Sequence, residues 1–275
     1  LIRVISESIT GKGHQMQRLD SLNALQSILI NHDPTVIQPH LHLLLSSDAS
    51  SAIVTTINDD WYRVIGAALN VVSSLCNVIR PIESVTSGGG TSGQNDPDEI
   101  AMDIEDDVND VPDASTAVSF NNTFFNTTDA KRMVTSLFEA VNARFLAVDI
   151  DQEIKEISIF AIGQIIYYFS DYLQESNAVQ PVLDGFRKRL DNEATRVVTL
   201  RALSVVVSSP LVSTDSIIMK NSTILDDFGQ VVATYMRQHS RTLQTSTVDC
   251  LSSMVKSVSF SSITPSTVST ILEES

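Results

Sequence analysis

Apolar residues recur at helical spacing along most of the chain. Positions i, i+3, i+4 and i+7 are apolar in a series of segments, and this period predicts amphipathic helices. The segments are RLDSLNALQSILIN (18–31), WYRVIGAALNVVSSLCNVI (61–79), AKRMVTSLFEAVNARFLAV (130–148), EIKEISIFAIGQIIYYF (153–169), ATRVVTLRALSVVV (194–207), LDDFGQVVATYMRQ (225–238) and RTLQTSTVDCLSSMV (241–255). No alternating run bounded by hairpin turn residues competes with them. The sequence therefore predicts an all-α fold.

Every second predicted helix carries a small residue followed by an aliphatic one at its centre. These pairs are Ala24-Leu25, Ala68-Leu69, Ala161-Ile162, Ala202-Leu203 and Cys250-Leu251. The steps between them are 44, 93, 41 and 48 residues, and the step of 93 falls to about 46 once an insert of about 47 is removed, which is close to the period of HEAT and armadillo units. We therefore expect helix pairs stacked into a HEAT/armadillo-type α-α superhelical solenoid.

One segment departs from this period and carries most of the charge. Between positions 82 and 128 the chain has ten acidic residues and no Lys or Arg, so removing them from the net charge of −15 leaves about −5. Gly, Ser and charge of one sign disfavour folding. We predict HEAT repeats over 1–83 with the first one truncated, a disordered acidic insert over 84–127, and HEAT repeats continuing the same solenoid over 128–275. The insert is either a solvated loop or a short partner-binding motif built on its interleaved apolar residues, Ile100, Met102, Ile104, Val108 and Val111.

Basic residues near the starts of the second helices have two interpretations. These helices are expected to begin after Asp60, after Asp149 or Asp151, and after Asn192, because such side chains cap helix N-termini. Arg18, Lys155 and Arg196 lie six residues before the small central residue, and Arg63 lies five before it. Such side chains either bond to Asp residues of adjacent turns or form a partner-binding stripe on the concave face. The candidate partner-binding residues are Arg63, Lys155, Arg196, Arg201 and Arg241.

A second basic group stands in DGFRKRLDNEATR, chiefly Arg187, Lys188, Arg189 and Arg196. Lys and Arg suit the C-terminal end of a helix dipole, and the same group would also serve as a docking patch for an acidic partner. The openings VIQPHLHLL and AVQPVLDGF each place Gln-Pro near a helix start. Proline is tolerated in the first turn of a helix and kinks the helix when it lies deeper, and a kinked first helix is common in HEAT units.

No pattern of catalytic or metal-binding residues is present in the sequence. It contains no CxxC, HExxH, nucleophile elbow or glycine-rich dinucleotide fingerprint. His40 and His42 are spaced i, i+2 and point apart on a helix, so they do not suit one metal. Cys76 and Cys250 sit among apolar residues, as small hydrophobes do. We expect no enzyme, no cofactor and no small-molecule substrate.

The net charge and the hydropathy of the chain argue against two kinds of partner, nucleic acid and membrane. An acidic chain is a poor nucleic-acid binder, and the best candidate membrane span, AIGQIIYYF, is broken by Gln164 and is short of the roughly 18 residues required. We therefore expect no direct nucleic-acid contact and no membrane span. Leu1 starts inside an apolar-periodic stretch without a signal-peptide pattern, so we expect a fragment boundary there.

The amino-acid sequences of several segments resemble one known family. AVDIDQEIKEISIFAIGQII, FRKRLDNEATRVVTLRALSVVVSSPL and YMRQHSRTLQTSTVDCLSSMVKS are similar to the middle of the cullin-associated, neddylation-dissociated (Cand) proteins, also known as TATA-binding-protein-interacting proteins. SLNALQSILINHDPTVIQPHLHLLL and ALNVVSSLCNVIRPIE resemble the repeats before it. The resemblance is collinear and covers nearly the whole chain apart from the insert, which replaces what we expect to be a short link in other members.

The resemblance implies a non-catalytic middle segment of a long HEAT superhelix. In that family the superhelix wraps an unneddylated cullin with its RING subunit and promotes exchange of substrate receptors. It also implies a cytoplasmic and nuclear protein. The alternative is a HEAT adaptor for another protein cargo, of the nuclear-transport or phosphatase-scaffold type. Such a protein would share the solenoid but not the sequence that runs from DIDQE to GQII.

Replacing residues 84–127 with a Gly/Ser link is expected to leave the melting temperature within a few degrees of the wild type, because long surface segments cost little loop entropy to change. Thermal unfolding followed by circular dichroism measures this, and limited proteolysis is expected to cut within 84–127 first. A larger fall in melting temperature would show that the segment packs on the solenoid.

Overall fold

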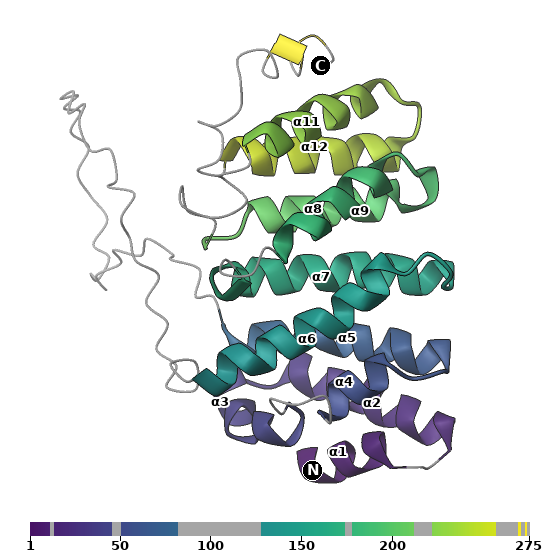
Figure 1. Cartoon of the computed structure of the whole chain (residues 1–275), viewed down its shortest axis with the longest axis vertical. Helices are drawn as coiled ribbons and strands as arrows, with labels where there is room; N and C mark the ends of the chain where they lie inside the picture. The colour runs from purple at the N-terminus through teal and green to yellow at the C-terminus, as the bar shows by residue number, and fades with distance from the viewer. Residues whose placement is uncertain are drawn as a thin grey trace, which may run out of the picture.

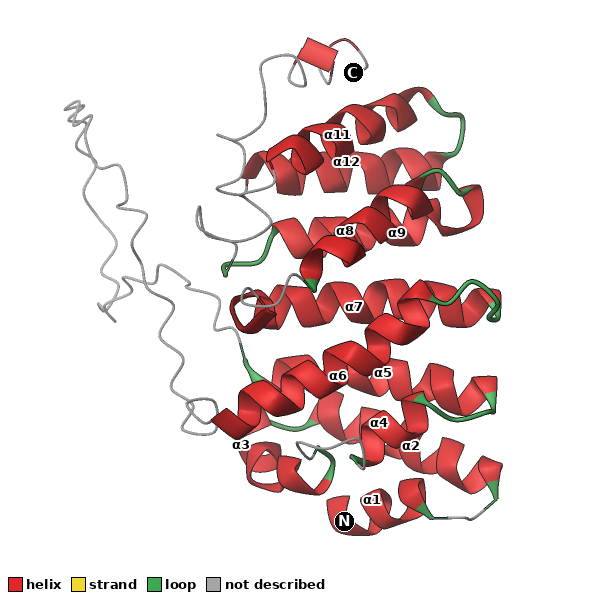
Figure 2. Ribbon diagram, in the orientation of Figure 1, coloured by secondary structure: helices red, strands yellow, loops and turns green. Residues whose placement is uncertain are grey.

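The computed structural model describes residues 1–11, 14–45, 51–81, 128–173, 178–211 and 222–256, together with 269–270 and 273. The predicted acidic insert, 84–127, lies outside these described residues. Every regular element within them is a helix, and no strand is present there (Figure 2). The all-α prediction is confirmed.

The helices form consecutive pairs, and we call the first and second members helix A and helix B. The first pair is α1 (Ile2–Thr10) with α2 (Gln15–Asn31). In the second pair, helix A is divided into α3 (Pro34–Ile37), η1 (Gln38–Leu43) and α4 (Ala52–Ile57), and helix B is α5 (Tyr62–Ile79). The third pair is α6 (Thr128–Leu146) with α7 (Gln152–Leu173), and the fourth is α8 (Val179–Leu190) with α9 (Glu193–Val207). The last pair is α11 (Ser222–Ala233) and η2 (Thr234–Arg237) with α12 (Arg241–Lys256).

The pairs stack in sequence order along the long axis of the molecule (Figure 1). Each helix B packs against the next, so α2, α5, α7, α9 and α12 form one continuous layer. The A helices form a second layer, in which α1 contacts α4, α4 contacts α6, and α6 contacts α8. Contacts between neighbouring units in two layers are the defining feature of a solenoid, so the predicted architecture is confirmed.

Small residues allow the B helices to approach closely. Four of the predicted central positions, Ala68, Ala161, Ala202 and Cys250, are 0% exposed. The approach is tightest between α7 and α9, where a β-carbon added at Gly163 would lie 3.2 Å from the β-carbon of Ala202. Ala24 differs, because it is exposed on the end face of α2, with no helix B before it in this chain. The repeat alignment therefore identifies the buried stacking positions of all units but the first.

The sequence predicted a capping residue before three of the B helices, and the structure agrees for two of them, α7 and α9. The Asp151 carboxylate accepts from the backbone N–H of Glu153 at 2.9 Å, and Asn192 accepts from that of Ala194 at 3.0 Å. The expected start after Asp60 is wrong. Asp59 accepts from the backbone N–H of Trp61 at 2.9 Å, and α5 begins at Tyr62. The N-cap of α5 is Trp61, which makes no side-chain cap bond, so Asp59 acts in the turn before the helix, where it also pairs with Arg18 of the preceding helix B.

The two Gln-Pro steps have different effects. Gln180-Pro181 lies in the first turn of α8, where proline is tolerated. At Gln38-Pro39 the helix changes from α to 3₁₀, because a proline inside a helix removes a hydrogen bond and clashes with the preceding turn. The two Gln-Pro steps therefore show both outcomes that the sequence allowed, a proline tolerated in the first turn of α8 and a change of helix type at Gln38.

An ion pair joins the two parts of the chain that flank residues 82–127. Arg80, just after α5, donates to both carboxylate oxygens of Asp171 in α7, at 2.7 and 3.0 Å, and to the carbonyl of Tyr168 at 3.0 Å. Arg80 is 6% exposed. A bidentate pair of this kind fixes geometry as well as charge. It holds the end of α5 in register with the following helix B.

Helix α5 corrects one expectation about membranes. By length and composition alone, Tyr62–Ile79 would suffice to cross a membrane, with a mean hydropathy of 1.4 over 18 residues. The shorter AIGQIIYYF had been the best candidate in the sequence. In the structure 67% of the α5 window is buried, between α2 and α7. The apolar character of α5 is that of a helix at the centre of a stack.

Substitution of a stacking residue is expected to destabilise the solenoid. Ala202→Leu places a larger side chain where α7 and α9 are in close contact, so we expect a loss of about 1–3 kcal/mol in the free energy of unfolding. Ala24→Leu makes the same change at the same repeat position on an exposed face, and it is expected to cost less than about 0.5 kcal/mol. Urea unfolding of both variants measures the difference, and equal losses would contradict the repeat alignment.

Candidate partner-binding surface

The first candidate, Arg63, lies in a groove of the helix B layer. The groove has a volume of about 320 Å³ and lies between α2, α5 and α7, with Asn23, Asn70 and Glu153 among its lining residues. The guanidinium of Arg63 lies 5.9 Å from the ring centre of Trp61, and its Nε donates to the hydroxyl of Tyr62 at 3.1 Å. Arg63 remains exposed, so it is held by aromatic side chains and still accessible to a partner.

Arg196 is held mainly by the backbone. Its Nε donates to the carbonyl of Leu190 at 2.8 Å, and an Nη donates to the carbonyl of Asp191 at 3.4 Å. Its guanidinium also lies 4.7 Å from the ring centre of Tyr235 in the next unit. These contacts give Arg196 a structural role between two units.

The other three candidates are less constrained. The ammonium group of Lys155 and the guanidinium groups of Arg201 and Arg241 have no side-chain hydrogen bond or ion pair with any residue that the structure describes. Arg201 and Arg241 are exposed, and Lys155 is half-buried. Lys155 lines a pocket with α8, away from the groove that contains Arg63.

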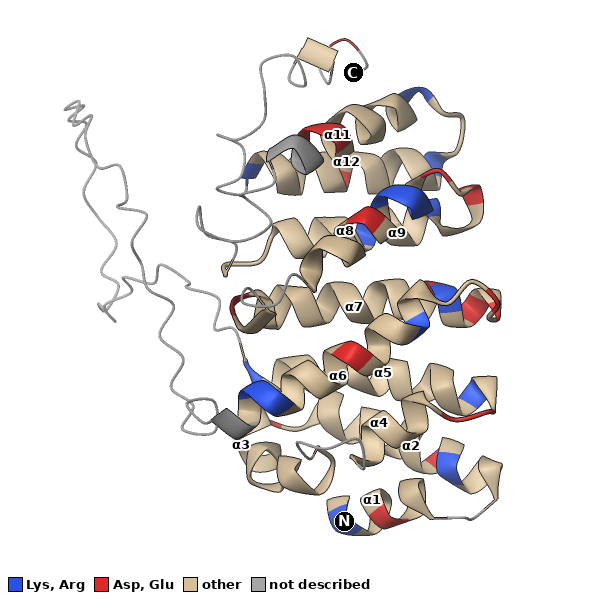
Figure 3. Ribbon diagram, viewed as in Figure 1, with Lys and Arg blue, Asp and Glu red and all other residues tan. Residues whose placement is uncertain are grey.

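The five candidates do not share one position in the repeat. Arg201 immediately precedes the small central residue of its helix, and the residues at the same position elsewhere are Asn23, Ala67, Phe160 and Asp249. Lys155 and Arg196 lie six positions before that residue, and Arg241 lies nine before it. Lys155 and Arg196 therefore share one repeat position and Arg63 is one position from it, whereas Arg201 and Arg241 occupy two others. Lys and Arg occur on helices of both layers (Figure 3).

The alternative interpretation, bonds from these basic residues to Asp in adjacent turns, is correct for Arg18 and, through a backbone carbonyl, for Arg196. Arg18 pairs with Asp59, which is 8% exposed. Arg196 makes no ion pair with an Asp carboxylate within the described part of the chain, and Arg63 and Lys155 make no bond to an Asp there, so the expectation was wrong for these two. Arg63 contacts Trp61 and Tyr62 instead.

Bonds between neighbouring units come instead from the ends of the A helices. Arg144 donates to the carbonyl of Ile57 at 2.9 Å, Arg189 donates to the carbonyl of Phe145, and the hydroxyl of Tyr235 donates to the carbonyl of Leu190 at 2.9 Å. The last carbonyls of a helix lack partners within it, so each unit satisfies a carbonyl of the unit before it. The sequence does contain a signal for these bonds, because Arg144 and Arg189 are 45 residues apart, which is close to one repeat period.

These bonds alter the interpretation of the basic group in α8. Arg187 pairs with Asp191 at 2.8 Å and with Asp227 at 2.6 Å, and Arg189 and Arg196 are bound to carbonyls. Only Lys188 of this group has no side-chain partner among the described residues. Most of the predicted docking patch therefore serves the structure of the solenoid.

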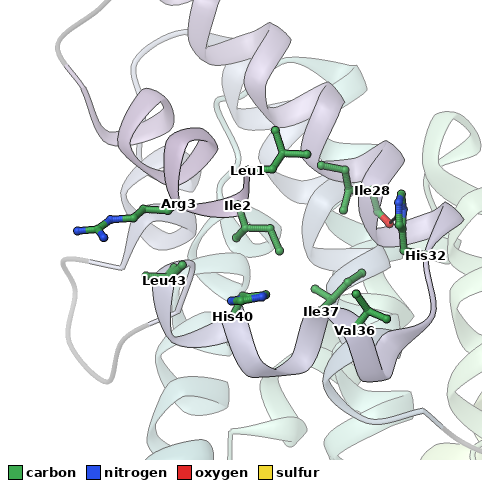
Figure 4. A pocket seen from close by; sticks show the side chains of 9 residues that line it. All are labelled: Leu1, Ile2, Arg3, Ile28, His32, Val36, Ile37, His40 and Leu43. Carbon is green, nitrogen blue, oxygen red and sulfur yellow. Dashed lines mark hydrogen bonds between the residues drawn. The ribbon is translucent and has the colours of Figure 1, made fainter.

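The most apolar pocket lies at the N-terminal end of the stack (Figure 4). Its volume is about 390 Å³, and Ile2, Ile28, Val36 and Ile37 are among its lining residues. His40 lies at its edge, and Arg3 extends away from it. The pocket contains no carboxylate or thiol, so its residues suit packing rather than chemistry.

Reactive and metal-binding groups are sparse in the described part of the chain. No group of three or more His, Cys, Asp or Glu side chains there is placed to hold a metal. Cys76 and Cys250 are buried free thiols. Burial raises the pKa of Cys250 to about 12, and it raises the pKa of Cys76 as well. Both thiols therefore stay protonated at neutral pH and pack as small apolar side chains.

The bonds at the ends of the A helices predict a measurable loss on substitution. Arg144→Met removes the donors to the carbonyls of Ile57 and Asp59, so we expect the free energy of unfolding to fall by about 1–3 kcal/mol. The matched control, Arg241→Met, changes an exposed guanidinium and is expected to shift it by less than about 0.5 kcal/mol. Chemical unfolding measures both, and equal values would remove the proposed role of Arg144.

Two kinds of comparison with known proteins bear on the family. The family model described as "CAND1-like, TPR repeats" matches residues 1–162. Proteins named Cullin-associated NEDD8-dissociated protein 1 are 29% identical over 93% of this chain in Dictyostelium discoideum and 30% identical over 91% in Drosophila melanogaster. This chain covers 18% and 16% of those proteins, so it spans less than a fifth of their length.

A solved structure supports the fold independently. A crystal structure of an engineered protein from the Northeast Structural Genomics Consortium matches with a TM-score of 0.59 and 10% identity, over 99% of this chain and 84% of the other. At that identity the likeness concerns the fold alone. The family match covers more than half of the chain and agrees with the stacked helix pairs, so this chain belongs to the CAND1-like family of helical repeat proteins.

Proposed function

We propose that this chain is a non-catalytic scaffold segment of a cullin-associated regulator of ubiquitin ligases. The observation that carries the proposal is its membership of the CAND1-like family, whose similar members are named for association with cullins. An uninterrupted stack of helix pairs gives an extended surface of the kind that solenoids use to contact large partners.

In this proposal the whole protein wraps an unneddylated cullin with its RING subunit and promotes exchange of substrate receptors, in the cytoplasm and the nucleus. The segment contributes shape, and its contact with the partner is spread over several units. Arg201 and Arg241 are the best candidates for direct contact, because both are exposed and the side chain of neither bonds to a residue that the structure describes. Arg63 is a further candidate on the groove between α2, α5 and α7.

The first test is binding of a purified cullin–RING pair to the chain and to the full-length protein, in unneddylated and neddylated forms. Measurable binding of the unneddylated form to the full-length protein, weakened by neddylation, supports the proposal. Failure of the full-length protein to bind either form would overturn it.

The contribution of the basic residues can be measured separately. Arg201→Gln with Arg241→Gln in the full-length protein is expected to reduce affinity for the cullin–RING pair roughly threefold to tenfold, with a smaller effect at higher salt, because exposed charge pairs are weak and screened. The melting temperature is expected to stay unchanged. Arg3→Gln with Lys256→Gln removes two exposed charges elsewhere and serves as the control. Unchanged affinity in the first variant would leave this segment as a spacer that sets the pitch of the superhelix.

A further inference from the structure

A second pocket opens at the corner where α6, α7 and α8 meet. Its volume is about 360 Å³, and it lies between the end of α6, the following turn, the start of α7 and one side of α8. The ring of Phe145 is buried and belongs to its lining. A β-carbon added at Gly185 would lie 2.5 Å from that ring, so the absence of a side chain at Gly185 allows α8 to lie directly against Phe145.

Two exposed apolar side chains lie together at this corner. Leu146 is 48% exposed and Val148 is 85% exposed, and both line the pocket together with Pro181. An apolar side chain of a partner that entered the pocket would remove this pair from water. The apolar surface extends from the pocket along the turn, which suits an extended chain better than a compact ligand.

The charge around the pocket has one sign. Its lining includes Lys155 from α7 and Lys188 and Arg189 from α8, and it includes no carboxylate. Arg189 is bound to the carbonyl of Phe145 and stacks on its ring at 4.6 Å. Lys155 and Lys188 have no side-chain partner among the described residues, so two ammonium groups remain available at the walls of the pocket.

Three acidic residues near the pocket bond to groups other than its two lysines. Asp151 accepts from the backbone at the start of α7, Asp184 accepts from Gln180, and Asp191 pairs with Arg187. Because the pocket lining itself contains no carboxylate, the ammonium groups of Lys155 and Lys188 remain open to a carboxylate that a partner brings.

We propose that this pocket binds a peptide segment of a partner protein in which one large apolar side chain is flanked by Asp or Glu. The apolar side chain enters between Leu146, Val148 and Pro181, and the flanking carboxylates contact Lys155 and Lys188. The pocket is of a size that accepts one such side chain. This inference does not rest on the proposed cullin association, because it follows from the chemistry of the corner alone.

The test uses the whole chain and a synthetic probe. The probe is a fluorescein-labelled peptide of twelve residues with one Leu at its centre and Asp or Glu on both sides. Binding is measured by fluorescence anisotropy at low and moderate salt. We expect a dissociation constant of roughly 10–500 µM, because one anchor and a few exposed charge pairs give weak affinity. Lys155→Gln with Lys188→Gln is expected to weaken it at least about fivefold.

The charge-matched control is Arg3→Gln with Lys256→Gln, at two exposed residues that do not line the pocket, and it is expected to bind the peptide as the wild type does. Val148→Ser tests the apolar part of the pocket at an exposed position that is not required for folding, and it is expected to weaken binding about threefold. Circular dichroism and the melting temperature confirm that each variant is folded. Two altered peptides, with Leu changed to Ser or with Asn and Gln in place of the acids, are expected to lose most of their binding.

Several results would overturn the proposal. They are no binding at millimolar peptide, equal loss in the variant of the two pocket lysines and in its control variant, or equal binding of the peptide that lacks Leu. Lysine-dependent dimerisation in sedimentation experiments would show that a second copy fills the pocket. A tenfold gain in affinity when residues 84–127 are replaced by a Gly/Ser link would assign the pocket to the chain's own acidic segment, and not to a partner.

Discussion

Close contact between small residues at the centres of successive B helices sets the distance at which the units stack. Ala68, Ala161, Ala202 and Cys250 are fully buried, and at Gly163 even one additional carbon would press on α9. Protein interiors are close-packed, so adding or removing one methylene group at such a contact changes the stability of the fold. The A helices are joined to the B helices by short turns. The grooves, the pocket corners and the bonds between helix ends therefore depend on this one spacing.

The fold was predictable because its determinants lie in a periodic signal. The position of the small residue could be read directly at Ala68, Ala161 and Ala202. Helix α5 begins one residue later than expected, because Asp59 binds the N–H of Trp61 in a turn before the helix and Trp61 is the N-cap. Asp59 also pairs with Arg18, which lies 41 residues away. A local pattern does not contain that contact.

The candidate surface was less predictable for a related reason. Composition shows how many cations a chain has, but it does not show which of them bond to backbone carbonyls, since every residue carries a carbonyl. Arg189 and Arg196 were expected in a basic patch, yet both hold the ends of helices. Lys155, Lys188, Arg201 and Arg241 are left for partners. To predict which cations bond to carbonyls, one would need to know which residues of neighbouring units lie opposite each other. The repeat period alone does not give that alignment to the single residue.

The ion pair between Arg80 and Asp171 has a consequence for how the chain folds. Its partners are 91 residues apart, whereas Arg18 and Asp59 in the preceding junction are 41 apart. Loop-closure entropy grows with the logarithm of length, so doubling the separation adds only about 0.6 kcal/mol. In kinetic terms this slows the joining of the two sides by about threefold, a small effect among the orders of magnitude spanned by folding rates. The stretch from 82 to 127 can therefore lengthen or shorten during evolution without turning one cooperatively folding solenoid into two.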